Sequence, residues 1–357
     1  MRILDFNRKL LTYDYKNWLE DYVSEKEVFP KIIELDPTTS CMFMCPDCIN
    51  SELINRNKSF TNGELDILIR ELAECGVLGI IFIGGGEPLM HPWFGEAIKL
   101  CKQLDIKVGI TTNGLLIDNY LDEIAEIADW TRVSMDASTK ETFYKVRPNN
   151  IRNSFNRILS NIEHLNKIKR GYVGYSFLLL ETESSCNIDE LYNAAYLSKK
   201  LGCDYFEYKP MVDQHHYLYQ YSNDFLEKYY QIITNLEELN SESFHVIHAM
   251  SMEQYFKPEL VQPKDYAICP VNDLRTVITP YGTYPCPYKR GYEEFNYGLA
   301  QSGFKKMWQD RKTALDASKD CSFYCIRHEL NLELEFLKRQ PEELKLINYK
   351  KTQDVFV

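Results

Sequence analysis

Three cysteines lie close together near the N-terminus, in the stretch TTSCMFMCPDCINSEL at residues 38–53. They are Cys41, Cys45 and Cys48. Thiolates at such short spacing bind zinc or an iron–sulfur cluster. A structural zinc site needs a fourth ligand, and the next histidine, His91, follows another strand and helix pattern. A [4Fe–4S] cluster held by three thiolates instead leaves one iron open to a non-protein ligand.

A second group of cysteines lies near the C-terminus. It contains Cys269, Cys286, Cys321 and Cys325. Four thiolates in two pairs fit a closed site for zinc or for one iron–sulfur cluster, and the spacing alone does not decide between them. The other four cysteines stand alone in apolar or helical patterns, and we expect them to be small buried hydrophobic residues. They are Cys75, Cys101, Cys186 and Cys203.

Short apolar runs alternate with amphipathic helical patterns along most of the chain. The predicted strands are residues 31–37, 79–84, 107–113, 131–137, 172–180 and 205–210. The predicted helices between them are residues 62–75, 94–104, 118–128, 151–168 and 187–201. Strand–helix alternation repeated six times indicates a parallel α/β sheet, open or curled into a partial barrel.

Polar residues recur two positions apart near the ends of four predicted strands. The pairs are Glu34 with Asp36, Thr111 with Asn113, Ser134 with Asp136, and Glu207 with Lys209. Side chains two apart on a strand share one face, so these residues would line a polar lumen at the carboxyl rim of the sheet. Glu207 and Lys209 are the catalytic candidates, and His215 and His216 follow them as further polar groups.

Composition limits the classes of partner. The chain has 357 residues, 45% of them hydrophobic, and a net charge of −11, which disfavours nucleic acid and anionic membranes. The longest apolar stretch, residues 76–86, is too short to span a bilayer, and the N-terminus lacks a signal-peptide pattern. We therefore expect a cytoplasmic protein whose cysteines are reduced thiols or metal ligands.

The spacing Cys41-x3-Cys45-x2-Cys48, followed one strand–helix unit later by IFIGGGEPLMHP, resembles the radical S-adenosylmethionine (SAM) enzymes. The resemblance implies a partial (β/α)6 barrel and a [4Fe–4S] cluster whose fourth ligand is the amino and carboxylate group of SAM. It also implies a set of cofactor-binding residues: Phe43, Gly84, Gly85, Gly86, Glu87, Thr112, Asn113, Ser134, Asp136 and Arg147. The family often has an aromatic residue before the third cysteine, but here Asp47 stands there. Phe43 is then the candidate for stacking on adenine.

Within this resemblance, individual residues have expected roles. Gly85, Gly86 and Glu87 would accept hydrogen bonds from the SAM ammonium group. Ser134 and Asp136 would bind the ribose, and Arg147 would pair with the carboxylate of SAM.

The C-terminal region resembles the SPASM or twitch domain, an auxiliary-cluster extension of many radical SAM enzymes. A predicted hairpin with the strand RTVIT leads to Cys286, and a helix follows Cys325. The resemblance implies one auxiliary [4Fe–4S] cluster bound by all four cysteines of the second group. The expected division is a helical preamble (1–30), the barrel (31–215), a linking helical segment (216–260) and the auxiliary domain with a C-terminal helix (261–357).

The function implied is reductive cleavage of SAM to a 5′-deoxyadenosyl radical that abstracts a substrate hydrogen. The preferred substrate is sugar-like or an aminocyclitol, oxidised at one carbon, because the strand ends offer many polar groups. A maturase of a ribosomally made peptide is the alternative, and a non-catalytic iron–sulfur or zinc protein is a remote one. A flavodoxin or ferredoxin would supply electrons, and no nucleic-acid or membrane partner is expected.

Overall fold

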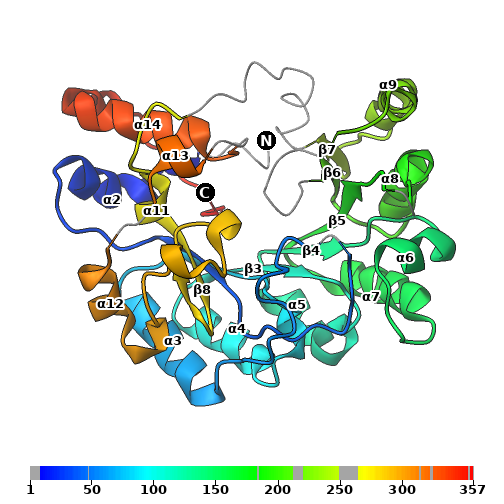
Figure 1. Cartoon of the computed structure of the whole chain (residues 1–357), viewed down its shortest axis with the longest axis horizontal. Helices are drawn as coiled ribbons and strands as arrows, with labels where there is room; N and C mark the ends of the chain where they lie inside the picture. The colour runs from blue at the N-terminus through cyan, green and yellow to red at the C-terminus, as the bar shows by residue number, and fades with distance from the viewer. Residues whose placement is uncertain are drawn as a thin grey trace.

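A curved, mostly parallel β-sheet organises the fold, with helices on its outer side (Figure 1). The computed structural model describes residues 9–46, 48–182, 185–211, 220–248, 264–312, 315–321, 325–352 and 354–356. Within them the strand order is β7-β6-β5-β4-β3-β2-β1-β8-β9. The predicted α/β class with a parallel sheet is confirmed.

The six predicted strands form the centre of the sheet, and every neighbouring pair is parallel. They are β1 (Ile32–Leu35), β2 (Gly79–Phe82), β3 (Lys107–Thr112), β4 (Trp130–Ser134), β5 (Tyr172–Leu179) and β6 (Tyr205–Pro210). The helices that follow them are α3 (Asn62–Glu74), α4 (Phe94–Gln103), α5 (Leu121–Ile127), α6 (Lys140–Val146), α7 (Ser154–Ile168), α8 (Leu191–Lys200) and α9 (Asn223–Glu237). Figure 1 shows these helices in an arc around the outside of the sheet.

Three further strands extend the sheet beyond the six that we predicted for the barrel. Strand β7 (His245–His248) pairs in parallel with β6, so residues 216–260 are not only a helical link. At the other edge β8 (Arg275–Thr279) pairs in parallel with β1, and β9 (Gly282–Tyr284) completes the predicted hairpin. The hairpin of the C-terminal region therefore continues the barrel sheet.

Local sequence explains why side chains alternate between the two faces of the sheet. Helix α3 begins with a capping box between Thr61 and Glu64, and its apolar face packs on the strands. Ile33 and Leu35 of β1 belong to this core between sheet and helices. Glu34, between them, must point to the opposite, concave face. The polar pairs of the strands consequently share the interior of the barrel.

Aromatic side chains fill the interior at the amino ends of the strands. Trp130 of β4 contacts Phe356 edge-to-face, with ring centroids 5.6 Å apart. The neighbouring strand positions are glycines, because a Cβ on Gly79 would lie 2.8 Å from the Phe356 ring and one on Gly109 would lie 2.4 Å from Trp130. Residues 354–356, which we call the C-terminal plug, thus close this end of the barrel.

Residues near the N-terminal end of the described chain hold the C-terminal plug in place. The Lys9 ammonium donates a hydrogen bond to the Phe356 carbonyl oxygen (3.0 Å) and pairs with Asp354 (2.7 Å), and the Tyr15 hydroxyl donates to the Val355 carbonyl. Tyr15 begins the buried face of α2 (Tyr13–Val23). The plug and α2 therefore form one unit.

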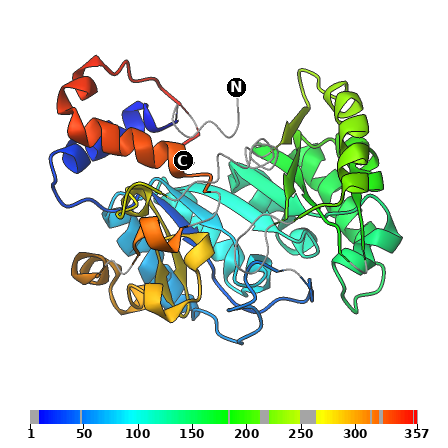
Figure 2. The ribbon, with the colours of Figure 1, turned by 45° about the horizontal axis from the view of Figure 1, so that its top comes forward.

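The N-terminal and C-terminal helices pack side by side (Figure 2). Helix α2 and helix α14 (His328–Arg339) share an apolar cluster with α11 (Val271–Leu274). Two short helices, α12 (Phe304–Asp310) and α13 (Ala317–Asp320), complete the C-terminal region. Among the described residues, no helix combines the length and apolar character that crossing a membrane requires.

Candidate active site

The loop with Cys41, Cys45 and Cys48 follows β1 at the carboxyl rim, and its three thiols are half-buried. The glycine-rich turn after β2 holds the start of this loop. A Cβ on Gly86 would lie 2.3 Å from the Ser40 carbonyl oxygen, so only glycine fits. The Glu87 amide also donates a hydrogen bond to that oxygen (2.8 Å). The turn and the cysteine loop thus form one backbone unit.

The side chain of Glu87 joins the same backbone unit to the end of β3. Its buried carboxylate accepts hydrogen bonds from the Thr112 hydroxyl (2.6 Å), the Asn113 amide (2.8 Å) and the Leu89 amide (3.2 Å). Burial raises the pKa of Glu87 to about 7, although these hydrogen bonds oppose the shift. Glu87 therefore ties the turn after β2 to the end of β3.

The other two glycines of the turn have different neighbours. A Cβ on Gly84 would lie 1.8 Å from the Gly86 carbonyl oxygen, so the turn itself requires glycine there. The Gly85 amide donates a hydrogen bond to Asp36 Oδ2 (2.6 Å). The turn is thereby connected to the end of β1 as well as to the loop.

Arg147 reaches the cysteine loop from the end of α6. Its Nη1 lies 3.8 Å from Cys45 Sγ, and its Nη2 pairs with the Asp136 carboxylate. Asp136 has a positive φ of 56° and also accepts a hydrogen bond from the Leu178 amide (2.7 Å). The buried Nε of Arg147 has no hydrogen-bond partner among the described residues. The structure thus brings Asp136, Arg147 and Cys45 together.

Three other predicted cofactor-contact residues have surroundings of different kinds. Phe43 is only 1% exposed and packs edge-to-face on Phe143, so its ring is a core residue and has no free face for an adenine ring. The expectation that Phe43 stacks on the cofactor does not fit this packing. Ser134 lies half-buried on the concave face of β4, in register with Ser176 of β5. The Asn113 side chain turns toward the cysteine loop, where its Nδ2 is 3.1 Å from Met42 Sδ.

A buried charge network connects β1 to the C-terminal region. Glu34, 1% exposed, pairs with Arg275 (2.8 Å), Arg290 (3.4 Å) and Arg327 (2.8 Å). Burial alone would raise the pKa of Glu34, but the three guanidinium groups hold it below its usual value. We call these four residues the Glu34 network.

Arg290 extends the Glu34 network to the cysteine loop. It donates a hydrogen bond to Asn50 Oδ1 (2.7 Å) and lies 3.2 Å from Asp36 Oδ2. Burial raises the pKa of Asp36 to about 6 despite this guanidinium, and its Oδ1 has no partner among the described residues. Asn50 stands two residues after Cys48 and Arg290 four residues after Cys286. The network therefore runs between the two cysteine groups.

The four C-terminal cysteines come from separate segments and still lie close enough to influence one another. Cys269 and Cys321 each have their pKa raised, first by burial and then by the charges of Cys286 and Cys325. Asn331 of α14 contacts the Cys269 sulfur, with Nδ2 at 3.3 Å. Within the described chain, no group of three or more Cys, His, Asp or Glu side chains is arranged around a single metal ion.

A second ionic cluster lies inside the barrel. Arg132 of β4 pairs with Glu207 of β6 (2.9 Å) and its Nη2 lies 3.4 Å from the Thr111 hydroxyl. Lys209 shares the concave face with Glu207, because Phe206 and Tyr208 of the same strand face the helix-side core. His215 and His216 lie outside the described residues.

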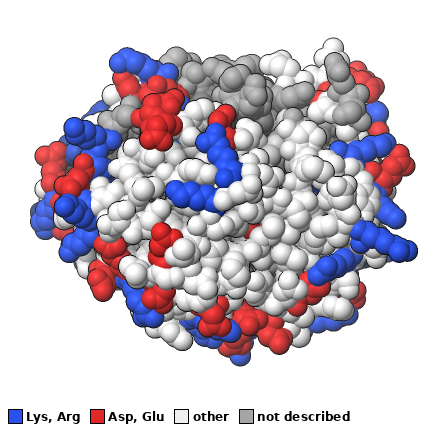
Figure 3. Space-filling view, turned by 60° about the horizontal axis from the view of Figure 1, so that its bottom comes forward, with Lys and Arg blue, Asp and Glu red and all other residues white. Residues whose placement is uncertain are grey.

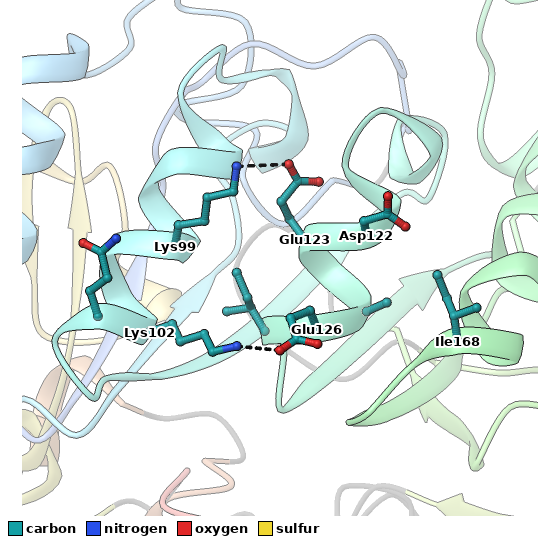
Figure 4. A pocket seen from close by; sticks show the side chains of 9 residues that line it. Lys99, Lys102, Asp122, Glu123, Glu126 and Ile168 are labelled. Carbon is teal, nitrogen blue, oxygen red and sulfur yellow. Dashed lines mark hydrogen bonds and ion pairs between the residues drawn. The ribbon is translucent and has the colours of Figure 1, made fainter.

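One surface hollow is unrelated to these groups. It has a volume of about 770 Å³ and lies between α4 and α5 on the outside of the barrel (Figure 4). The ion pairs Lys99–Glu123 (3.2 Å) and Lys102–Glu126 (2.7 Å) cross it. Figure 3 shows one face of the molecule, where acidic and basic side chains alternate around a mostly uncharged centre.

Four arginines that organise the site were not among the residues predicted from the sequence. They are Arg132, Arg275, Arg290 and Arg327. A signal existed for Arg132, which lies two positions before Ser134 and so shares its face. Arg290 and Arg327 follow Cys286 and Cys325 closely, but only the tertiary structure shows that they turn toward β1.

The radical SAM superfamily model matches residues 35–195, which include the cysteine loop, the glycine-rich turn, Asp136 and Arg147. This segment, less than half of the chain, is similar to the radical SAM superfamily. The chain is 33% identical over 118 residues to GTP 3′,8-cyclase of Chlorobaculum tepidum, a match that covers 32% of this chain and 35% of that enzyme. It is 32% identical over 114 residues to PqqA peptide cyclase of Bradyrhizobium diazoefficiens, covering 31% and 29% of the two chains. The chain thus spans about a third of the length of these curated relatives.

The fold likeness extends further than the sequence match. SuiB of Streptococcus suis, solved with bound S-adenosylmethionine, superposes with a TM-score of 0.62 at 16% identity. The alignment covers 80% of this chain and 67% of SuiB. The likeness at this identity concerns the fold, and it supports the partial barrel of the radical SAM superfamily.

The superfamily uses a [4Fe–4S] cluster and S-adenosylmethionine, and the donors of this chain fit both. Cys41 has its pKa raised by burial and further by Cys45 and Cys48, so the three thiols lie near one another. Soft sulfur ligands suit iron, and three of them leave one iron open. The unpaired Nε of Arg147 beside Cys45 offers a buried donor for an anionic group of the cofactor.

Proposed function

We propose that this chain is a radical SAM enzyme that oxidises or otherwise modifies a carbon of a sugar-like or aminocyclitol substrate. Cys41, Cys45 and Cys48 would hold the [4Fe–4S] cluster. When bound, the cluster and SAM supply reductive cleavage to a 5′-deoxyadenosyl radical, which removes a hydrogen atom from the substrate. The observation that carries this proposal is the joint position of the cysteine loop, the glycine-rich turn and Arg147 at one rim of the barrel.

In this proposal Arg147 orients the cofactor carboxylate and Asp136 fixes the guanidinium. The Asp136 carboxylate holds Nη2, and Nε remains available as a donor. Glu87 acts indirectly, because its oxygens bind Thr112 and Asn113 and it therefore positions the turn beside the loop. The backbone of Gly84, Gly85 and Gly86 would line the methionine moiety of SAM.

We further propose that the C-terminal cysteine group holds an auxiliary [4Fe–4S] cluster. A four-iron cluster spreads its thiolate ligands farther apart than a zinc ion with Zn–S bonds of about 2.3 Å. The support for a shared site is that burial and the charges of Cys286 and Cys325 raise the pKa values of Cys269 and Cys321, so the four thiols lie near one another. A closed cluster beside the barrel would accept an electron from a substrate radical and so favour an oxidised product.

Epimerisation would instead require a hydrogen-donating thiol inside the barrel, and the remaining cysteines do not offer one. Cys101 is fully buried in the core between sheet and helices. Cys203 lies before β6, at the amino end of that strand, and contacts Asn166. Cys186 is exposed and Cys75 caps the end of α3. Oxidation, or bond formation followed by electron return, is therefore the preferred outcome.

A peptide substrate is the second candidate. PqqA peptide cyclase is among the relatives named above, and SuiB has also been solved bound to its precursor peptide SuiA. The polar, charged interior around Arg132 and Glu207 supports the small-molecule substrate over an apolar peptide segment.

The proposal is tested on anaerobically reconstituted and reduced enzyme. Formation of 5′-deoxyadenosine and methionine from SAM is expected even without substrate, at a slow rate. Replacing Arg147 with methionine should weaken SAM binding about tenfold while the iron content stays unchanged. A matched control is Arg157→Met, which removes an exposed arginine paired with Asp118. SAM cleavage absent from protein with a full complement of iron would contradict the function.

A further inference from the structure

The interior of the barrel contains more positive charge than its partners neutralise. Arg132 has Glu207 as its ion-pair partner, and its Nε has no hydrogen-bond partner among the described residues. Lys209 forms no ion pair or hydrogen bond with another described residue, although the Glu207 carboxylate on the same strand attracts it. Two cations therefore share one carboxylate in this cluster.

The position of Lys209 relates this surplus to the cofactor site. The Arg132–Glu207 pair occupies the middle of the concave face, and Lys209 lies two residues farther along β6, nearer the carboxyl rim. At that level the charges of Asp136 and Arg147 affect the pKa of Lys209. Arg147 is the residue that contacts the cysteine loop. The amino end below is closed by Trp130 and the C-terminal plug. An occupant of the cluster would thus lie between the closed end and the cysteine loop.

The hydrogen-bonding groups around the cluster suit an anion. The Thr111 hydroxyl contacts Arg132, and the hydroxyls of Ser134 and Ser176 lie on neighbouring strands in register with Glu207. Burial lowers the pKa of Lys209, and the Arg132 charge lowers it further. An anionic ligand would reverse this penalty, because it would be paired with both cations in a partly desolvated site.

We propose that Lys209 and Arg132 bind a carboxylate or phosphate group of the substrate, with Glu207 positioning the Arg132 guanidinium. This inference rests on the proposed function and narrows its substrate class to anionic small molecules, such as a sugar acid or a phosphorylated sugar. A planar guanidinium fits both carboxylate and phosphate oxygens, and a lysine adds a second charge without fixed geometry. The anion would anchor the substrate in the barrel while a neighbouring carbon faces the rim.

The test measures access to Lys209 on the reconstituted enzyme with SAM bound. The protein is treated with acetic anhydride under anaerobic conditions, and acetylation of each lysine is followed by peptide mass spectrometry. Inorganic phosphate or sodium acetate should slow acetylation of Lys209 at least fivefold. Lys167, an exposed lysine paired with Glu163 on α7, serves as the control and should be unaffected. Stronger protection by phosphate would indicate a phosphate ester, and stronger protection by acetate would indicate a carboxylate.

Two variants make the test independent of how readily Lys209 reacts. In Arg132→Met, at least fivefold more anion should be needed for the same protection. Equilibrium dialysis with radiolabelled phosphate should show at least fivefold weaker binding to Lys209→Met than to the unchanged enzyme. Equal binding to both proteins would overturn the inference, and so would full protection of Lys209 by SAM alone.

The failure of this inference and that of the proposed function can be distinguished. If the enzyme cleaves SAM but no anion protects Lys209, the anion site is refuted and the radical SAM function stands. If anions protect Lys209 in an enzyme that does not cleave SAM, the anion site stands and the proposed function is refuted.

Discussion

The two cysteine groups are assembled in different ways. Cys41, Cys45 and Cys48 belong to one eight-residue loop that stays half-buried at the barrel rim. The C-terminal group combines residues 269, 286, 321 and 325, which the fold brings together from the start of α11, the end of the hairpin and the region before α14. The loop with the first group is held in place by other segments, such as the glycine-rich turn. The second group itself connects segments that are distant in sequence. We therefore expect the first to control chemistry and the second to control stability.

The largest expected effect is on chemistry at the first group. Replacing Cys41, Cys45 and Cys48 together with alanine should reduce SAM cleavage to background and lower the iron content from about eight to about four atoms per chain. Cys75→Ala is the matched control, since this half-buried thiol lies at the end of α3 outside both groups. Iron analysis and 5′-deoxyadenosine quantification decide the result. Stoichiometric zinc with only four irons in the unchanged protein would refute the auxiliary-cluster proposal.

Loss of the second group should mainly affect stability. A cluster bound by four distant cysteines adds its binding free energy to folding and closes long loops. The double variant Cys286→Ser, Cys325→Ser should therefore lose several kcal/mol, on the order of 3 to 5. Urea unfolding of the reconstituted proteins under anaerobic conditions measures the difference. An unchanged midpoint would show that the second group is not a structural staple.

Disruption of the Glu34 network should destabilise the protein and lower the iron content of both cysteine groups. Glu34→Gln removes the carboxylate that the three buried arginines of the network share, which should cost about 3 to 5 kcal/mol of unfolding free energy. The control Glu141→Gln removes an exposed carboxylate paired with Lys145 and should leave the free energy of unfolding nearly unchanged. Urea titrations measure both changes. Loss of iron from only one of the two groups would contradict a shared network.

A pH-dependent effect is expected at Glu87. Its folded pKa of about 7 lies above the ordinary 4.5, so the protonated carboxyl favours the folded state. The stabilisation is fully present below pH 4.5 and is lost as the pH rises through 7. Metal-free protein should lose about 2 to 3 kcal/mol over this interval relative to Glu87→Gln, which cannot ionise. Parallel pH profiles of the two proteins would refute the buried-carboxyl explanation.

The smallest expected effect concerns the contact between turn and loop. Gly86→Ala would place a Cβ against the Ser40 carbonyl and should displace the cysteine loop at a cost of about 1 to 3 kcal/mol. Gly63→Ala is the control, because nothing lies within 4 Å of its added Cβ. Iron content after reconstitution should fall in the first variant and stay unchanged in the second. Equal iron in both would mean that the loop adapts to the methyl group.

The sequence predicted the local features of the molecule well. The cysteine loop, the six central strands and the polar face with Glu34 and Asp36 follow from short spacing and alternation, which depend on neighbours along the chain. Contacts between distant segments were not predictable. The strand β8 was expected in a separate domain, but its backbone pairs with β1 because that sheet edge is otherwise unpaired.

Side-chain environments were also beyond the sequence. Phe43 was a candidate for a ligand contact, yet Phe143 covers its ring, and no local pattern indicates that packing. Glu87 was predicted to contact the cofactor, and its contacts with Thr112 and Asn113 could not be predicted from the sequence. In both cases the identity of the residue was informative and its partner was not.

The C-terminal plug has a consequence for the order in which the molecule matures during synthesis. Phe356 fills the amino end of the barrel and is held by Lys9, so this end cannot close until nearly every described residue has left the ribosome. In a nascent chain that carries only the six central strands, the barrel interior is still open to water at the amino ends of the strands. Enclosure of the reaction chamber is therefore a late event, completed by residues that lie far in sequence from every cysteine of the first group.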